Sequence, residues 1–410
     1  MTFYGCKISR TNLMSRKGKI MALALKEMGS RQERRRRMAL EKDTREQMSF
    51  CTAHTESYED PMLVISEARL RDNARRFKAA MPRVRPHFAV KANPHGDVLR
   101  IFKEEGLCFE VASIAEIDAM IELDVNIETV FYSNPIKSPA SVKRATEAGI
   151  KWFVVDTPEE VEKIAKINPV AKLYLRIEVS NEGSVWPLCG KFGASPSGVA
   201  AVIKSAKTHG MSLTGATFHV GSQCNNISNW TKGISAVREL FVTLEDNGWT
   251  PELLNIGGGY PLLLSPEDPT IEEIGKIINE ELKSIPESIQ IMGEPGRFLV
   301  GSAGCLITQA VGLATRDDKR WLYLDTGFYG GLLEVAQKFP LKIVSQRTGK
   351  VEPWTLAGPT CDSVDVLGDH ALPSNIKVED ILFVPNLGAY CTTCACDFNG
   401  FPVPEIVLTD

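Results

Sequence analysis

One lysine stands where a short apolar segment gives way to a turn. Phe88–Val90 predicts a buried strand, Lys91 follows it, and Ala92–Pro94 breaks the strand. A lysine among apolar groups loses hydration, which lowers its pKa and makes its neutral amine nucleophilic enough to form a Schiff base. The alternative is a lysine whose stem packs at a strand end while its ammonium group stays in water.

Two further segments with reactive or flexible residues also follow apolar runs. Gly257–Gly259 comes directly after Leu253–Ile256, and glycines allow backbone N–H groups to approach a phosphate closely. His219 ends an earlier apolar run and can stack on a flat ring, and Ser222 can add a hydroxyl to the same phosphate. The alternatives are a tight turn at the glycines and a histidine that is satisfied in the core.

A carboxylate and a guanidinium stand close together at Glu294-Pro295-Gly296-Arg297. A carboxylate that pairs with a pyridine nitrogen keeps this nitrogen protonated and makes the ring an electron sink. Arg297 is placed to pair with a phosphate. The alternative is a surface ion pair between Glu294 and Arg297.

Two segments near the end of the chain carry further candidate groups. Cys361-Asp362 places a thiol beside a carboxylate, which can donate a proton or bind an amine. Tyr390 offers a phenol that can reach a phosphate. The alternatives are a turn with a structural cysteine and a tyrosine in the core.

Short apolar segments alternate with helical segments from residue 61 to residue 300. This alternation is typical of parallel strands with right-handed crossovers, and about eight strand–helix units fit a closed barrel better than an open sheet. Active sites in such barrels lie at the carboxyl ends of the strands, where Lys91, His219, Gly257–Gly259 and Glu294 fall. We therefore predict an α/β fold with a (β/α)8 barrel over residues 61–300.

The rest of the chain predicts two other parts. Residues 301–410 change to strands and turns and predict an all-β domain, which residues 51–60 complete. Residues 1–50 are rich in Lys and Arg, including Arg34–Arg37, and contain little that would pack a core. We expect a solvated arm that is partly helical or poorly ordered. A targeting peptide and an extension of the gene model are the alternatives.

Composition places few restrictions on function. The 410 residues carry a net charge of −4, which does not suggest nucleic acid or a membrane surface as a partner, and no apolar run is long enough for a membrane span. Ten cysteines without a secretory signal lead us to expect free thiols in the cytoplasm. Cys391, Cys394 and Cys396 have C-x-x-C-x-C spacing, but no second Cys/His pair is near, so we expect no metal.

A series of motifs between residues 60 and 402 resembles, in order, the fold-type III pyridoxal phosphate (PLP) decarboxylases, the ornithine/diaminopimelate decarboxylase family. The bacterial lysine/ornithine decarboxylases are the most similar members. The motifs are PHFAVKANP, FEVASIAEID, VSNEGSVWPLCGKFG, FHVGSQ, NIGGGYP, EPGRFLVG, LDTGFYGGLLE, LAGPTCDSVDVL, and GAY followed by DFNGFP.

The resemblance implies a role for each candidate residue. Lys91 would form the Schiff base with PLP, His219 would stack over the ring, and Glu294 would hold the pyridine nitrogen. Six residues would hold the phosphate, namely Ser222, Gly257, Gly258, Gly259, Arg297 and Tyr390.

The resemblance also implies a homodimer. Cys361 would protonate the carbanion that remains after CO2 leaves, and Asp362 would contact the substrate amine. In this family both residues come from the partner subunit. We therefore expect a head-to-tail homodimer with shared active sites and a small amino acid as substrate.

The chain departs from the family in a few positions. Glu110 stands where the family usually has Asp, which we expect to be tolerated. After Gly330–Leu333, close relatives continue with acidic residues that help to bind the distal amine of the substrate. This chain reads Val335–Pro340, which is shorter and not acidic, so Glu334 remains as the nearby carboxylate. A distal ammonium without a carboxylate would lose an ion pair in a partly dry site, which leaves the substrate open.

Three hypotheses follow. The first is PLP-dependent decarboxylation of ornithine or lysine, giving putrescine or cadaverine in polyamine biosynthesis. The second is a decarboxylase of another substrate, such as diaminopimelate, carboxynorspermidine or a precursor in specialised metabolism. The third is a catalytically dead homologue that acts as a regulator. Such a protein should have lost the lysine or the Cys-Asp pair, whereas Lys91, Cys361 and Asp362 are all present.

Overall fold

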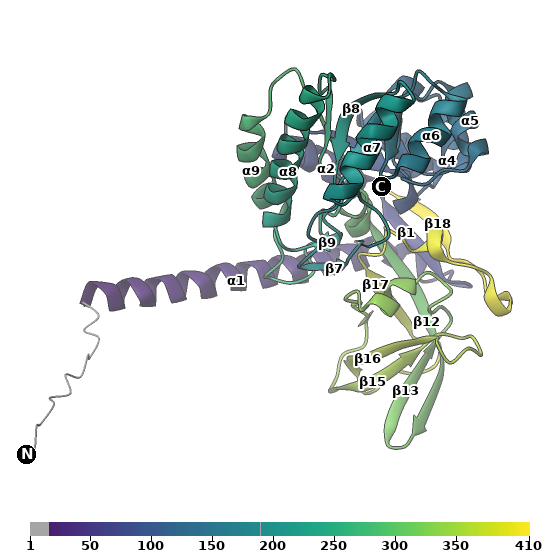
Figure 1. Cartoon of the computed structure of the whole chain (residues 1–410). Coiled ribbons are helices and arrows are strands. Elements are labelled where there is room, and N and C mark those ends of the chain that lie inside the picture. The colour runs from purple at the N-terminus through teal and green to yellow at the C-terminus, as the bar shows by residue number, and fades with distance from the viewer. Residues whose placement is uncertain (1–15, 189) are drawn as a thin grey trace, which may run out of the picture.

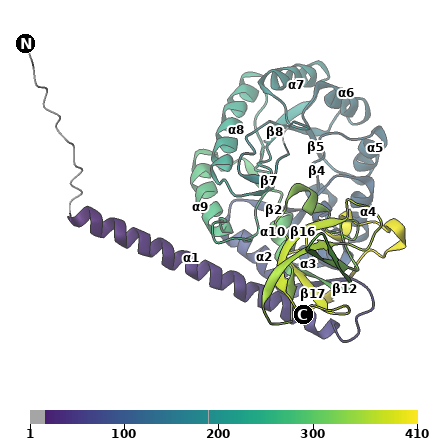
Figure 2. The same ribbon diagram turned by 90° about the horizontal axis from the view of Figure 1, so that it is seen from below.

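A closed parallel barrel forms the upper part of the molecule, and a ring of helices surrounds it (Figure 1, Figure 2). The computed structural model describes residues 16–188 and 190–410. The barrel strands are, in order around the barrel, β2 (Arg85–Ala89), β3 (Cys108–Val111), β4 (Phe131–Tyr132), β5 (Trp152–Val155), β6 (Lys172–Arg176), β8 (Ser212–Thr217), β10 (Leu253–Asn255) and β11 (Gln290–Gly293). The predicted barrel is confirmed.

Most of the barrel helices begin at side-chain caps, which local sequence encodes. Ser113 accepts a hydrogen bond from the Glu116 N–H, and Thr270 and Glu273 form a capping box. The helices are α2 (Glu67–Ala80), α3 (Gly96–Glu104), α4 (Ile114–Glu122), α5 (Pro139–Ala148), α6 (Pro158–Ile167), α7 (Pro196–Thr208), α8 (Ser228–Asp246) and α9 (Ile271–Glu281), and the short α10 (Arg297–Val300) follows β11. The helices with a side-chain cap are α2, α4, α5, α6, α7 and α9.

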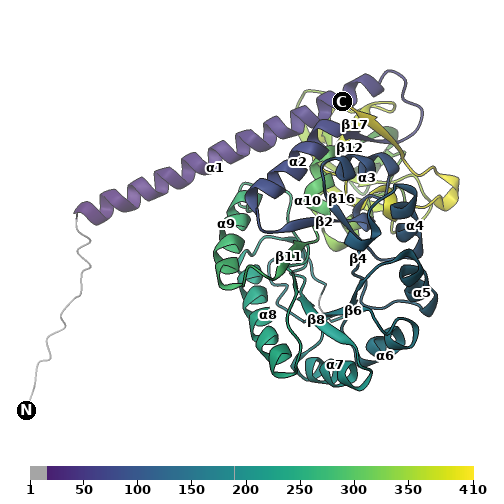
Figure 3. The ribbon, with the colours of Figure 1, turned by 90° about the horizontal axis from the view of Figure 1, so that it is seen from above.

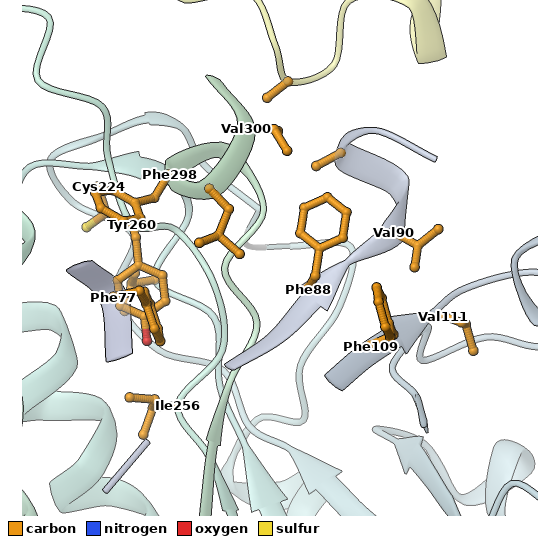
Figure 4. Close-up of a cluster of buried hydrophobic side chains, with 14 of the residues drawn as sticks. Phe77, Phe88, Val90, Phe109, Val111, Cys224, Ile256, Tyr260, Phe298 and Val300 are labelled. Atoms are coloured by element: carbon orange, nitrogen blue, oxygen red, sulfur yellow. The ribbon is translucent and has the colours of Figure 1, made fainter. Parts of the chain in front are cut away.

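Alternation along β2 decides which of its side chains face the apolar core. Phe88 and Val90 are fully buried in the cluster of apolar side chains drawn in Figure 4, where Phe109 of β3 lies beside Phe88. His87 instead contacts Phe131 of β4, with ring centroids 4.9 Å apart. Because successive side chains of a strand point to opposite faces, His87 and Ala89 form the row opposite Phe88, and Lys91 follows in the turn directly after the strand, at the mouth of the barrel.

The second domain is a mixed sheet of β1 (Met62–Ser66), β12 (Gly304–Arg316), β13 (Lys319–Leu324), β14 (Val344–Ser345), β15 (Val351–Ala357), β16 (Val366–Pro373), β17 (Ile381–Pro385) and β18 (Glu405–Thr409). One expectation is wrong here: Met62–Ser66 is not a barrel strand, because it pairs with β12 and β18. A short apolar run shows that a strand is buried but not which sheet it joins, since strand pairing is non-local.

A long N-terminal helix, α1 (Arg16–Cys51), extends from the body to one side (Figure 2, Figure 3). Its last turns pack on both domains. Arg36 donates to the Pro266 carbonyl at 2.9 Å, and Gln47 exchanges hydrogen bonds with Asn386. Residues 16–51 are helical, in line with the partly helical alternative, whereas a solvated or poorly ordered arm is wrong for residues 36–51; residues 1–15 lie outside the described chain. Thr44, Gln47 and Cys51 share one helix face and are all buried, but the first two are polar, so hydrophobic periodicity does not predict this face.

Among the described residues, no helix combines the length and the apolar character that a membrane crossing requires.

We predict that Gln47→Ala weakens the docking of α1. The fully buried Gln47 accepts from the Asn386 N–H at 2.8 Å and donates to the Asn386 Oδ1 at 2.9 Å. The variant leaves the backbone N–H and the side-chain Oδ1 of Asn386 without their partner. The free energy of unfolding, measured in a urea titration, should therefore fall by about 2 kcal/mol. The exposed Arg45 on the same helix is the control, and Arg45→Ala should change stability by less than about 0.5 kcal/mol. Equal stability of both variants would contradict this docking.

Candidate active site

A lysine and a glutamate from neighbouring strands meet at the barrel mouth. Lys91 lies in a 3-10 turn (Val90–Ala92) directly after β2, and Glu110 lies in β3 opposite Ala89 in the parallel pairing. The Lys91 Nζ donates a hydrogen bond to the Glu110 Oε1. The Glu110 side chain is 1% exposed, whereas that of Lys91 is 48% exposed because it faces the open mouth.

This pair changes the expected charge of Lys91. Burial lowers the pKa of Lys91, but the Glu110 carboxylate, with Tyr390 and Glu294, outweighs burial and holds the pKa above its ordinary value. The lowered pKa expected from the strand pattern is therefore wrong in this arrangement, because the strand pattern does not reveal the acidic neighbours. Burial, with help from Glu294, raises the pKa of Glu110 to about 7 against the opposing effect of Lys91. Glu110 therefore stabilises the ammonium form of Lys91 as an ion pair, and the amine becomes nucleophilic only after this ammonium has lost its proton.

Glu294 and the glycine turn are built as one unit by Asn255. This fully buried side chain donates to the Glu294 Oε1 at 2.7 Å and accepts from the Gly257 N–H at 2.8 Å. The Glu294 N–H in turn donates to the Gly257 carbonyl at 2.8 Å. Asn255 is a site residue that the sequence analysis missed, and its signal was a polar residue inside an apolar strand.

The glycine turn has no room for side chains. Gly257 has φ +67°, and a Cβ there would lie 2.0 Å from the Phe218 carbonyl oxygen. Gly259 has φ +99°, and its Cβ would lie 2.2 Å from the Gly221 carbonyl oxygen. The turn is therefore tight, as the alternative reading held, and it also leaves bare backbone at the barrel mouth, which suits a phosphate.

His219 is held as a neutral ring. Its Nδ1 accepts a hydrogen bond from the Gly221 N–H at 3.0 Å, which leaves the proton on Nε2. Burial, with the positive charges of Arg176 and Lys91, lowers the pKa of His219 well below its ordinary value. A neutral imidazole can lie against an aromatic ring without an added charge.

Three of the expected phosphate ligands come together around Arg297 at the start of α10. Arg297 Nη2 donates to the Ser222 Oγ at 3.1 Å, and the guanidinium carbon lies 5.0 Å from the centre of the Tyr390 ring. Arg297 is not paired with Glu294, so the alternative of a mutual ion pair is not found. Its carboxylate partner is Glu334, at 2.7 Å between Nη1 and Oε2.

Cys361 and Asp362 lie in the β domain and are not bonded to this group. The Cys361 Sγ is exposed and 3.2 Å from the Asn399 Oδ1. Asp362 accepts a hydrogen bond from the Tyr329 hydroxyl at 2.6 Å, which lowers the pKa of this carboxyl. In the single chain, Cys361 and Asp362 therefore form these hydrogen bonds with other residues of the β domain and not with the residues at the barrel mouth.

Arg176, the last residue of β6, is a second site residue that the sequence analysis missed. It lines one small cavity with His219 and Glu294. Burial lowers the pKa of Arg176, although Glu294 and Asp156 oppose this effect. Its signal was an arginine at the carboxyl end of a predicted barrel strand.

Comparison with known proteins agrees with this geometry. Residues 67–301 match the family described as pyridoxal-dependent decarboxylase, pyridoxal binding domain. The chain is 32% identical over 358 residues to the lysine/ornithine decarboxylase of Selenomonas ruminantium, covering 85% of this chain and 90% of that protein. It is 33% identical over 348 residues to antizyme inhibitor 2 of Xenopus laevis, covering 80% and 76%.

Solved structures show the same likeness. The lysine/ornithine decarboxylase of Vibrio vulnificus, complexed with putrescine, has a TM-score of 0.82 and 30% sequence identity, covering 89% of this chain and 98% of that one. The glycine turn, the polar groups around Arg297 and the lysine at the end of β2 provide groups that fit PLP. The chain therefore belongs to the fold-type III PLP-dependent amino acid decarboxylases.

Proposed function

We propose that this protein decarboxylates a basic L-amino acid, with ornithine or lysine as the first candidate and putrescine or cadaverine as the product. One observation carries the proposal: the Lys91 Nζ donates to Glu110 at the barrel mouth, where Asn255 also fixes the Glu294 carboxylate. An amine for covalent attachment, a carboxylate that positions it and a second carboxylate for a pyridine nitrogen are groups that suit PLP chemistry. The relatives that are lysine/ornithine decarboxylases support the choice of substrate.

Each residue has a defined task in this proposal. When bound, PLP supplies the electron sink that accepts the electron pair left by CO2. Glu294, fixed by Asn255, holds the proton on the pyridine nitrogen, and neutral His219 supports the ring. Glu110 pairs with the Lys91 ammonium and holds it at the barrel mouth, where its amine attaches the cofactor once the proton has left.

A further set of residues holds the phosphate. Backbone N–H groups at Gly258 and Gly259 would hold the anion at the barrel mouth, while Gly257, whose own N–H donates to Asn255, shapes the turn, and the side chains of Ser222, Arg297 and Tyr390 would complete the ligands. The guanidinium contributes a full positive charge and directed N–H donors, which makes it the strongest of these ligands.

Cys361 and Asp362 act across a dimer interface in this proposal. Cys361 protonates Cα after CO2 leaves, and Asp362 contacts the substrate amine, both from the partner subunit of a head-to-tail homodimer. Two observations support this: Cys361 is exposed and Asp362 is half-buried in the single chain, and Val364 and Phe398 beside them are exposed apolar groups, at 53% and 38%. Exposed apolar groups around a polar centre are typical of an interface.

Two other functions have specific support. The non-acidic segment Val335–Pro340 favours a decarboxylase of another substrate, such as diaminopimelate, carboxynorspermidine or a precursor in specialised metabolism. The likeness to antizyme inhibitor 2 favours a regulator without catalysis. The presence of Lys91, Glu294 and Cys361 argues against the regulator.

The first prediction concerns the substrate. CO2 release by the purified protein with added PLP is measured over ornithine, lysine, arginine, diaminopimelate and carboxynorspermidine. We expect ornithine or lysine to be turned over fastest, and Cys361→Ala to slow this turnover by about a hundredfold or more, because a general acid is lost. Preference for another amino acid would select the second function. Bound PLP without turnover of any of these amino acids would keep the fold and the cofactor and place the substrate outside this set.

The second prediction concerns the attachment point. Lys91→Ala should abolish the visible absorbance of the PLP-bound protein and the mass increase after borohydride reduction, because the variant removes the amine that attaches the cofactor in this proposal. Lys319→Ala, at an exposed site in the β domain, is the control and should keep both signals. Survival of the chromophore in Lys91→Ala would show that another residue binds PLP.

The third prediction concerns the shared site. Lys91→Ala and Cys361→Ala should each be nearly inactive alone. Coexpression in equal amounts should restore about one quarter of the wild-type activity, because half of the dimers are mixed and each of these has one intact site. No recovery, with mixed dimers shown by differently tagged chains, would place both residues in the site of a single subunit.

A further inference from the structure

The guanidinium of Arg297 is shared between two different neighbours. Its side chain is 5% exposed, so water does not neutralise its charge and a protein group must do so. Glu334 accepts from Nη1 at 2.7 Å and also from Nη2. Ser222 takes the other edge, at 3.3 Å from Nε and 3.1 Å from Nη2. One edge of the guanidinium therefore faces an anion, and the other faces a neutral hydroxyl of the expected phosphate site.

The surroundings keep Glu334 in this position. Its side chain is 13% exposed, and the guanidinium that it binds lies between two aromatic rings, with Phe339 at 4.4 Å and Tyr390 at 5.0 Å from the guanidinium carbon to the ring centres. Leu332, 2% exposed, and Leu387, 6% exposed, line the same small pocket as Glu334. In such surroundings an ion pair is hard to separate, because each lone charge would be left without water.

We propose that Glu334 is the resident counter-ion of Arg297 and competes with the cofactor phosphate for this guanidinium, and that it is not a ligand of the distal ammonium of the substrate. The inference rests on the proposed phosphate role of Arg297. A phosphate that arrives beside Ser222 must share one positive charge with Glu334. The two anions repel each other at short range, so pairing of Glu334 and binding of the phosphate oppose each other.

The proposal also bears on substrate choice. Glu334 is the single acidic residue of the segment 330–340, and its carboxylate is committed to Arg297. The distal group of a substrate therefore meets no free carboxylate from this segment of its own chain. Asp362 of the partner subunit is left as the group that recognises the amine.

The experiment compares the affinity of apoprotein for two ligands that differ by one group. PLP carries the phosphate and pyridoxal lacks it, while both can react with Lys91. Glu334→Gln keeps the size of the side chain and removes its charge. We expect the variant to bind PLP about tenfold more tightly than the wild type does, since a like-charge neighbour of the phosphate is gone. Its affinity for pyridoxal should be unchanged.

Thermal unfolding supplies a second readout. Without ligand, Glu334→Gln should unfold at a lower temperature than the wild type, because Arg297 is left buried and unpaired. PLP should restore much of this difference and pyridoxal should not. The matched control is Glu352→Gln, which breaks a pair of 2.6 Å with Arg320 in the β domain and should leave the affinity for PLP unchanged.

The remaining outcomes each decide for or against the proposal. Unchanged or weaker PLP binding by Glu334→Gln would overturn it, and a raised KM for ornithine with unchanged PLP affinity would assign Glu334 to the distal amine. A variant that folds only with PLP, and not with pyridoxal, would support it, whereas one that folds with neither would overturn it. If no amino acid is turned over but the difference in PLP affinity remains, the proposed function fails and the counter-ion role stands.

Discussion

Pairing of charges in a place with little water is the constraint on which the site depends. The barrel mouth collects lysine, arginine and carboxylate groups from separate strands, and a buried charge without a partner is costly. Glu110 therefore holds Lys91, Asn255 holds Glu294, and Glu334 holds Arg297. Without a ligand, these contacts determine which side chains are protonated. A ligand that binds here must replace them with contacts of its own.

The closed barrel is what makes this collection possible. Parallel strands end at one rim, so residues that are far apart in the chain become neighbours when they follow different strands. The apolar side chains of β2 lock its register against the surrounding helices, which leaves Lys91 at the rim. The glycine turn after β10 then approaches the segment of His219 so closely that a methyl group would not fit.

The β domain and α1 do more than extend the barrel. The backbone N–H of Tyr390 donates to the Ala92 carbonyl at 2.9 Å, so a β-domain loop is tied directly to the turn that carries Lys91. The η6 turn (Leu333–Gln337) brings Glu334 to Arg297 in the same way. The last turns of α1 contact Asn386, four residues before Tyr390. The site is therefore held jointly by both domains, and the docked helix braces the loop between them.

The sequence by itself determined the barrel, the cofactor family and the candidate residues, because strand–helix alternation and ordered motifs are local patterns that survive without coordinates. It did not determine the partners of those residues. The pKa of Lys91 depends on Glu110, the assignment of Glu334 depends on Arg297, and the sheet that receives Met62–Ser66 depends on β12 and β18. Each of these is a contact between distant parts of the chain, and only the tertiary structure sets the distance, burial and opposing charge on which its energy depends.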